Sequence, residues 1–264
     1  MEELAAKSKR PGWEVPTLFL ILFAFLVLNL ATSSRFPLPW QDEDVFADVA
    51  VNMATGQGFV STVSRCGDNL GHFWACNAPL YPFMLGEWTR TFGFTIRAVR
   101  SLNYVLISLC VGVLWFAVRR LELIPHAPQR IVFATLLLTG YGMGFIYRSA
   151  RYDCLGLLLF SLVLLSYSLR SRRIRILAIG LLGCLMPITG IQLILYSTLF
   201  CVVMIAFLRM RVLWEAVALE TGVFAGSISL LALYQAHGVC PIFRDRRSDS
   251  WKRDSNTHRK IQAS

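Results

Sequence analysis

Residues 15–32 read VPTLFLILFAFLVLNLAT, an uncharged apolar run close to the N-terminus. A run of this length can cross the hydrocarbon core of a bilayer as one helix. It is longer than the apolar core of a signal peptide and lacks a clear small-x-small cleavage site, so we expect an uncleaved first membrane span. Lys7, Lys9 and Arg10 precede it, which predicts a cytoplasmic N-terminus.

The composition of the whole chain is typical of a membrane protein. Of its 264 residues, 55% are hydrophobic and only 16% are charged, and the apolar residues fall in long runs. The net charge of +10 comes from basic residues that mostly lie at the ends of these runs, where they would meet lipid headgroups. We therefore expect membrane lipid, and no nucleic acid, as a partner.

Further apolar runs predict the remaining membrane spans. They cover residues 98–118, 131–147, 154–169 and 214–234. The stretch 176–208 is too long for one ordinary span, and Pro187 and Gly190 favour two helices joined by an outer turn at residues 186–190. One long kinked helix is the alternative, and it would reverse the sidedness of everything after it. Four arginines between residues 170 and 175 mark a cytoplasmic turn.

The predicted fold is therefore an all-α polytopic membrane protein with about seven transmembrane helices and a large first outer loop. That loop, residues 33–97, holds several prolines and glycines and no spanning segment. Within it, residues 43–55 suit a short amphipathic helix that ends before Gly56. Residues 83–92 alternate aromatic and charged side chains and are expected to lie along the membrane surface.

An acidic stretch follows the first span. It reads Gln41-Asp42-Glu43-Asp44-Val45-Phe46-Ala47-Asp48, with four carboxylates. One interpretation is structural, because acids at the start of a helix interact favourably with its dipole. The other is catalytic, because a carboxylate can deprotonate an acceptor while an arginine holds a departing phosphate.

Two further features are expected on the outer side, namely an arginine near an aspartate and a pair of cysteines. Arg151 and Asp153 are expected on the same side of the membrane as the acids, where Arg151 is either a phosphate ligand or an interfacial anchor paired with Asp153. Cys66 and Cys76 are the only cysteines of the first outer loop, and they are either disulfide-bonded or two unpaired thiols.

Other chemical motifs are missing from the sequence. It contains no GxxxxGK phosphate loop, no HExxH pair, no GxSxG elbow and no clustered metal-ligand spacing, so no metal site is predicted. Few charged or polar residues fall at the centres of the spans, which disfavours an ion pathway. Whether a divalent metal assists is left open.

The first loop resembles a known family. Asp42-Glu43, followed by Phe46, Ala50 and Gly56-Gln57-Gly58-Phe59, is similar to the first-loop motif of GT-C membrane glycosyltransferases. The branch most resembled is that of protein O-mannosyltransferases and lipid A aminoarabinose transferases. Ala78-Pro79-Leu80-Tyr81-Pro82 is similar to the family's proline-tyrosine segment, and Arg151-Tyr152-Asp153 opens a following helix. The resemblance covers roughly residues 12–240.

The resemblance implies a transferase that moves a sugar from a polyprenyl-phosphate donor to a lipid, glycan or protein acceptor. The reaction would take place on the outer face of a bacterial plasma (inner) membrane. Asp42 is then the candidate general base, and Glu43 orients the acceptor or the donor. The expected substrate-binding residues are Arg151 at the phosphate, Asp153 beside it, and Tyr81 and His72 as walls of the sugar pocket.

The chain departs from the family in its length. GT-C enzymes usually carry more than seven spans, whereas we expect one membrane domain over residues 1–240 and a polar, basic, disordered tail over residues 241–264. The chain is then a short variant, a truncated product or one part of a complex. Two further classes stay open, namely a non-catalytic membrane partner and a transporter of lipids or small solutes.

Overall fold

The computed structural model describes residues 12–38, 41–63, 73–208 and 212–237. Within these ranges helices are the regular secondary structure, and there is no strand. The helices are α1 (Glu14–Thr32), α2 (Gln41–Ala54), α3 (Leu80–Phe92), α4 (Ile96–Arg120), α5 (Ala127–Thr139), α6 (Tyr141–Tyr147), α7 (Asp153–Ser166), α8 (Arg172–Thr189), α9 (Gln192–Leu208) and α10 (Leu213–Ala236). The predicted all-α class is confirmed for this part of the chain.

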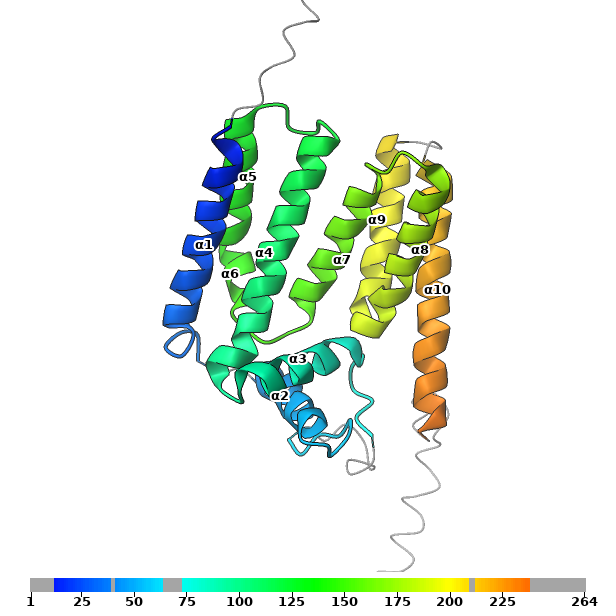
Figure 1. Ribbon diagram of the computed structural model, residues 1–264. Helices are drawn as coiled ribbons and strands as arrows, with labels where there is room; N and C mark the ends of the chain where they lie inside the picture. Colours follow the sequence, from blue (N-terminus) through cyan, green and yellow to red (C-terminus); the bar gives the residue numbers. More distant parts are fainter. Residues whose placement is uncertain (1–11, 39–40, 64–72, 209–211, 238–264) are drawn as a thin grey trace, which may run out of the picture.

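Most of the helices run side by side, and two lie across one end. α1, α5 and α6 form one flank of the bundle, α4 and α7 its middle, and α8, α9 and α10 the other flank, while α2 and α3 cross the lower end (Figure 1). One apolar core is centred on α4 around Tyr104 and Ile107. A second, around Ile179 and Leu219, joins α7 to the helices of the second flank.

Three helices are long and apolar enough to cross a membrane, namely α1, α4 and α10. α5 and α6 meet at a bend of 58° and would add a fourth span if they cross together. Large apolar side chains such as Leu20, Leu195 and Phe224 are exposed on the flanks, as expected for surfaces that face lipid. α7 and α9 are apolar but shorter, so the count of seven spans stays a prediction.

The long apolar stretch 176–208 is divided into two helices, as predicted. The break falls at Gly190, later than expected, and Pro187 lies inside α8. A Cβ at Gly190 would overlap the ring of Tyr152, so a larger residue here would require that ring to move. α8 then packs along α10, where added Cβ atoms at Gly222 and Gly226 would overlap the backbone of α8. Small residues of this kind let membrane helices approach closely.

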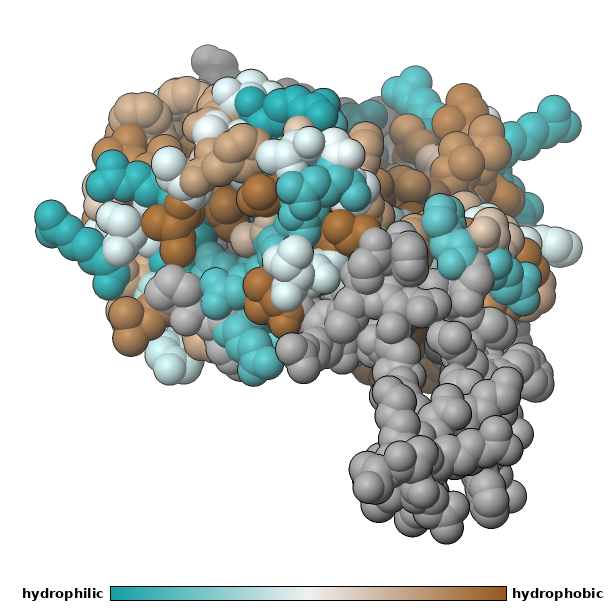
Figure 2. Space-filling view, turned by 90° about the horizontal axis from the view of Figure 1, so that it is seen from below, coloured by the Kyte–Doolittle hydropathy of each residue, from teal (hydrophilic) through white to brown (hydrophobic). Residues whose placement is uncertain are grey.

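The amphipathic helix of the first loop is also confirmed. α2 buries Phe46, Val49 and Ala50 against α3, and the Phe46 ring packs edge-on against Tyr81 at 5.7 Å between centroids. The chain leaves the helix through Gly56, whose φ of +83° is a conformation that glycine adopts readily. α2 and α3 together close one end of the bundle, and Figure 2 shows hydrophilic and hydrophobic side chains intermixed on this face.

Candidate functional site

The neighbouring acids Asp42 and Glu43 point into different surroundings. Glu43 is buried, and its two carboxylate oxygens accept hydrogen bonds from Nε and Nη2 of Arg100 at 2.7 and 2.8 Å. Arg100 is fully buried and also donates from Nη1 to the carbonyl oxygen of Ser33 at 2.5 Å. This bidentate pair fixes α2 to α4 and to the end of α1. The geometry therefore gives Glu43 a structural contact in place of an open substrate-facing position.

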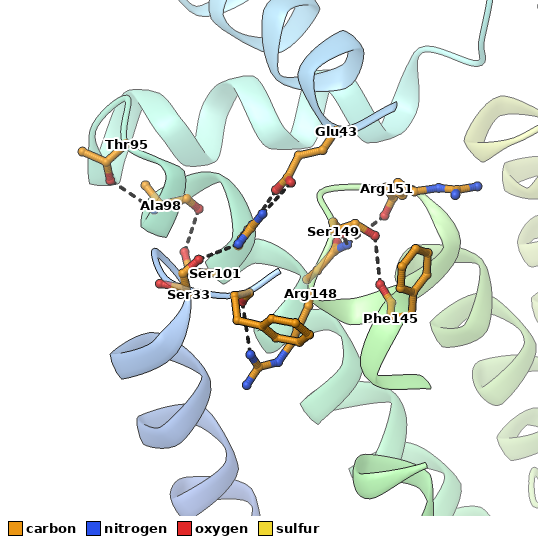
Figure 3. Close-up of polar contacts among 12 residues, drawn as sticks. Ser33, Glu43, Thr95, Ala98, Ser101, Phe145, Arg148, Ser149 and Arg151 are labelled. Atoms are coloured by element: carbon orange, nitrogen blue, oxygen red, sulfur yellow. Dashed lines mark hydrogen bonds and ion pairs between the residues drawn. The ribbon is translucent and has the colours of Figure 1, made fainter. Parts of the chain in front are cut away.

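Asp42, Arg151 and Asp153 lie together at the accessible surface, and we call them the outer cluster. Nη1 of Arg151 lies 3.3 Å from Oδ2 of Asp42, and its Nε lies 3.1 Å from Oδ2 of Asp153. Their side chains are 48%, 24% and 28% exposed, in the order Asp42, Arg151, Asp153. Figure 3 shows Glu43 pointing towards the segment after α1 that holds Ser33, whereas Arg151 extends in another direction. Three of the predicted site residues thus converge, and Glu43 does not join them.

Asn103 of α4 holds the backbone segment that carries Arg151. The side-chain amide of Asn103 donates to the carbonyl oxygens of Ser149 and Arg151 at 2.5 and 2.9 Å. Its oxygen accepts a hydrogen bond from the Tyr81 hydroxyl at 3.0 Å. Because this segment connects α6 to α7, these contacts fix the point from which Arg151 and Asp153 project.

Tyr81 does not line an open surface. Its side chain is fully buried, so the expected role as a wall of a sugar pocket is not supported by its position. Burial raises the pKa of Tyr81 well above its ordinary value, and the hydroxyl therefore keeps its proton and donates to Asn103. Tyr81 is a positioning residue for the Arg151 segment. The other predicted pocket residue, His72, lies outside the described residues.

The two remaining acids of the stretch differ from each other. Asp44 is exposed on the first turn of α2. Asp48 accepts hydrogen bonds from the Ser61 hydroxyl at 2.8 Å and from the Thr62 amide and hydroxyl at 2.7 and 2.6 Å. Burial opposes ionisation of Asp48, but these hydrogen bonds outweigh it and lower its pKa. Asp48 therefore closes the loop that follows α2.

The structure describes one cysteine of the predicted pair. Cys76 is disulfide-bonded, whereas Cys66 lies outside the described residues. Cys110, Cys154 and Cys184, on apolar helices, are free thiols. In the described ranges, no three His, Cys, Asp or Glu side chains are close enough together to hold a metal ion.

Sequence reasoning overlooked the partners of the buried acids. Arg100 lies inside the apolar run that predicted the second span, and a charge in such a run requires a partner. The same holds at the opposite end of α1. There Glu14, fully buried, accepts hydrogen bonds from Nε and Nη2 of Arg130 at 2.6 and 2.8 Å. The signal in the sequence was a charged residue at or inside an apolar run, because a carboxylate or a guanidinium buried there needs a partner of opposite charge.

Comparisons with known proteins do not assign the chain to a family. A scan against protein-family models finds no match, and searches of curated proteins and of solved structures find none either. The resemblance to GT-C glycosyltransferases therefore depends on the quoted motifs of the first loop and on Arg151-Tyr152-Asp153 alone. What the chain does has to be argued from its own side chains.

Proposed function

We propose that this protein is a membrane glycosyltransferase. It moves a sugar from a polyprenyl-phosphate donor to a lipid, glycan or protein acceptor at the outer face of a bacterial plasma membrane. The observation that carries this proposal is the contact of Asp42, Arg151 and Asp153 at the accessible end of the bundle. A carboxylate next to a guanidinium supplies a general base and a phosphate ligand within one side chain's reach.

The outer cluster divides the chemistry among its three members. The acceptor oxygen attacks the anomeric carbon of the donor, the bond from that carbon to the phosphate oxygen breaks, and the polyprenyl phosphate leaves with the electron pair. Asp42, the most exposed of the three, takes the acceptor's proton. Arg151 stabilises the departing phosphate, and Asp153 holds the Nε side of its guanidinium. Glu43 contributes indirectly, by fixing α2 through Arg100.

A membrane arrangement of seven spans accompanies this proposal, with α5 and α6 crossing as one. The last turn of α4 and the first turn of α8 carry arginines, and both helix ends lie opposite α2 and α3 (Figure 1). Basic residues favour the cytoplasmic side, so the outer cluster faces outwards. After reduction, a membrane-impermeant thiol reagent should label Cys76 from outside in intact cells. Labelling from the cytoplasmic side alone would overturn this topology.

The enzymatic proposal is tested by removing the base. The protein is reconstituted in lipid nanodiscs and supplied with a panel of polyprenyl-phosphate sugars, membrane lipids and protein acceptors. Asp42→Asn should lower sugar transfer roughly 100-fold or more, the scale of a lost general base. Asp44→Asn is the matched control, because Asp44 is an exposed acid two positions along the same helix. Full turnover by Asp42→Asn would sink the assignment.

A non-catalytic membrane partner is the second candidate. It is favoured by the pairing of Arg151 with two carboxylates, which is also what a purely structural network would show. In that case Asp42→Asn would weaken association with the partner protein, and no sugar would be transferred by the unchanged protein. Measurement of transfer by the unchanged protein therefore separates the two classes.

A further inference from the structure

A hollow of about 350 Å³ opens on the flank of the bundle between α1, α3 and the start of α4. Its apolar lining comes from Leu26 and Leu30 of α1, Trp88 and Phe92 of α3, and Val105 of α4. The volume lies at the lower end of the roughly 300–1,000 Å³ typical of small-molecule sites. It is large enough for part of one acyl chain, and its lining is complementary to one.

The polar side of the hollow is cationic. Arg97 lines it together with Thr95 and Ser101, and no carboxylate is among its lining residues. The Arg97 side chain is exposed, and its one long hydrogen bond, at 3.4 Å, goes to the Ser34 hydroxyl. A guanidinium in this position is free to bind a phosphate oxygen with its remaining donors.

The place of the hollow in the bundle identifies the kind of ligand. α1 and α4 are both candidate membrane spans, so the hollow faces the bilayer. Thr95 and Arg97 stand at the start of α4 and Trp88 on the crossing helix α3, which is the level of the headgroups, where Trp and Arg are favoured. An occupant therefore has its apolar part along α1 and its charged part at Arg97.

We propose that this hollow binds one anionic phospholipid of the surrounding bilayer as a fixed structural lipid. One acyl chain lies along Leu26 and Leu30, and the headgroup phosphate pairs with Arg97. The lipid bridges α1 to α3 and α4 at the end of the bundle that α3 crosses. None of the outer-cluster residues lines the hollow, so the proposal stands independently of the glycosyltransferase assignment.

The test measures lipid retention. The protein is reconstituted in nanodiscs of equal parts phosphatidylglycerol and phosphatidylcholine, released into mild detergent, and examined by native mass spectrometry. We expect one retained phosphatidylglycerol per protein, in preference to phosphatidylcholine. Arg97→Gln should lower the retained fraction about fivefold, the effect of one basic residue near an anionic surface. Leu30→Trp, which fills the hollow with an indole, should abolish retention.

Arg35→Gln is the matched control, because Arg35 is an exposed arginine at the same end of α1 and does not line the hollow. It should retain the lipid as the unchanged protein does. Circular dichroism and gel filtration check that each variant is folded. Equal retention of both phospholipids, or a retained lipid that neither Arg97→Gln nor Leu30→Trp affects, would each overturn the proposal.

Discussion

Removal of the Glu43 carboxylate should destabilise the protein more than removal of any exposed acid. Glu43→Ala leaves Arg100 buried, with both hydrogen bonds to the carboxylate lost and only the carbonyl oxygen of Ser33 as a remaining partner. Breaking a buried ion pair in this way costs about 3–5 kcal/mol. In a domain of this size about 1 kcal/mol shifts Tm by roughly 2–4 °C, so we expect Tm to fall by about 6–20 °C.

A double variant tests whether the unpaired Arg100 charge causes the loss of stability. If the unpaired Arg100 charge is the cause, then Glu43→Met combined with Arg100→Met should recover most of the stability, because apolar side chains of similar volume can replace a buried pair. The assay is thermal unfolding in nanodiscs, followed by circular dichroism. Asp44→Asn, one position along α2 and exposed, is the control. A fall of less than 2 °C for Glu43→Ala, or a double variant no more stable than Glu43→Ala, would refute this reasoning.

Three further variants test other contacts. Gly226→Leu should separate α10 from α8, because its side chain would overlap the Cys184 backbone, and should cost about 1–3 kcal/mol or more in thermal unfolding. The pKa of Asp48 is lowered in the folded protein, so its carboxylate stabilises the fold above the ordinary pKa of 3.8, and this stabilisation is lost as the pH falls below that value. Asp48→Asn should remove this acid sensitivity, measured as the change in Tm between about pH 3 and 6. Tyr81→Phe loses the hydrogen bond to Asn103, so Tm should reveal a cost of about 1 kcal/mol and sugar transfer should slow.

Local signals in the sequence predicted much of the fold because they act over a few residues. Pro187 and Gly190 predicted a break in the stretch 176–208, and α8 ends at Thr189, directly before Gly190. The period of apolar residues in α2 matches the face it buries, from Phe46 to Ala50. The span count could not be predicted equally well. α7 and α9 are apolar but short, and whether a short helix crosses depends on the helices that pack beside it.

The candidate site shows why the acidic pair was only partly predictable. Consecutive residues of a helix point about 100° apart, so Asp42 and Glu43 could never serve one ligand equally. Which of them turns inwards depends on Arg100, which is 57 residues away in sequence and meets Glu43 only through the packing of α4 beside α2. Spacing alone therefore indicated the acidic stretch as a candidate, and tertiary packing decides which of the two acids lies at the surface.

A buried carboxylate–guanidinium pair lies at each end of α1, and the outer cluster differs from both pairs in its exposure and contact lengths. At one end Glu14 takes two donors from Arg130 and a third from the Trp115 indole at 2.9 Å. At the other, Arg100 joins Glu43 to the residue after α1. These buried pairs hold α1 to α4 and α5 and bring α2 to the end of the bundle. Asp42 and Arg151, by contrast, are partly exposed and joined by a longer contact of 3.3 Å, which a phosphate can displace at lower cost than a buried bidentate pair.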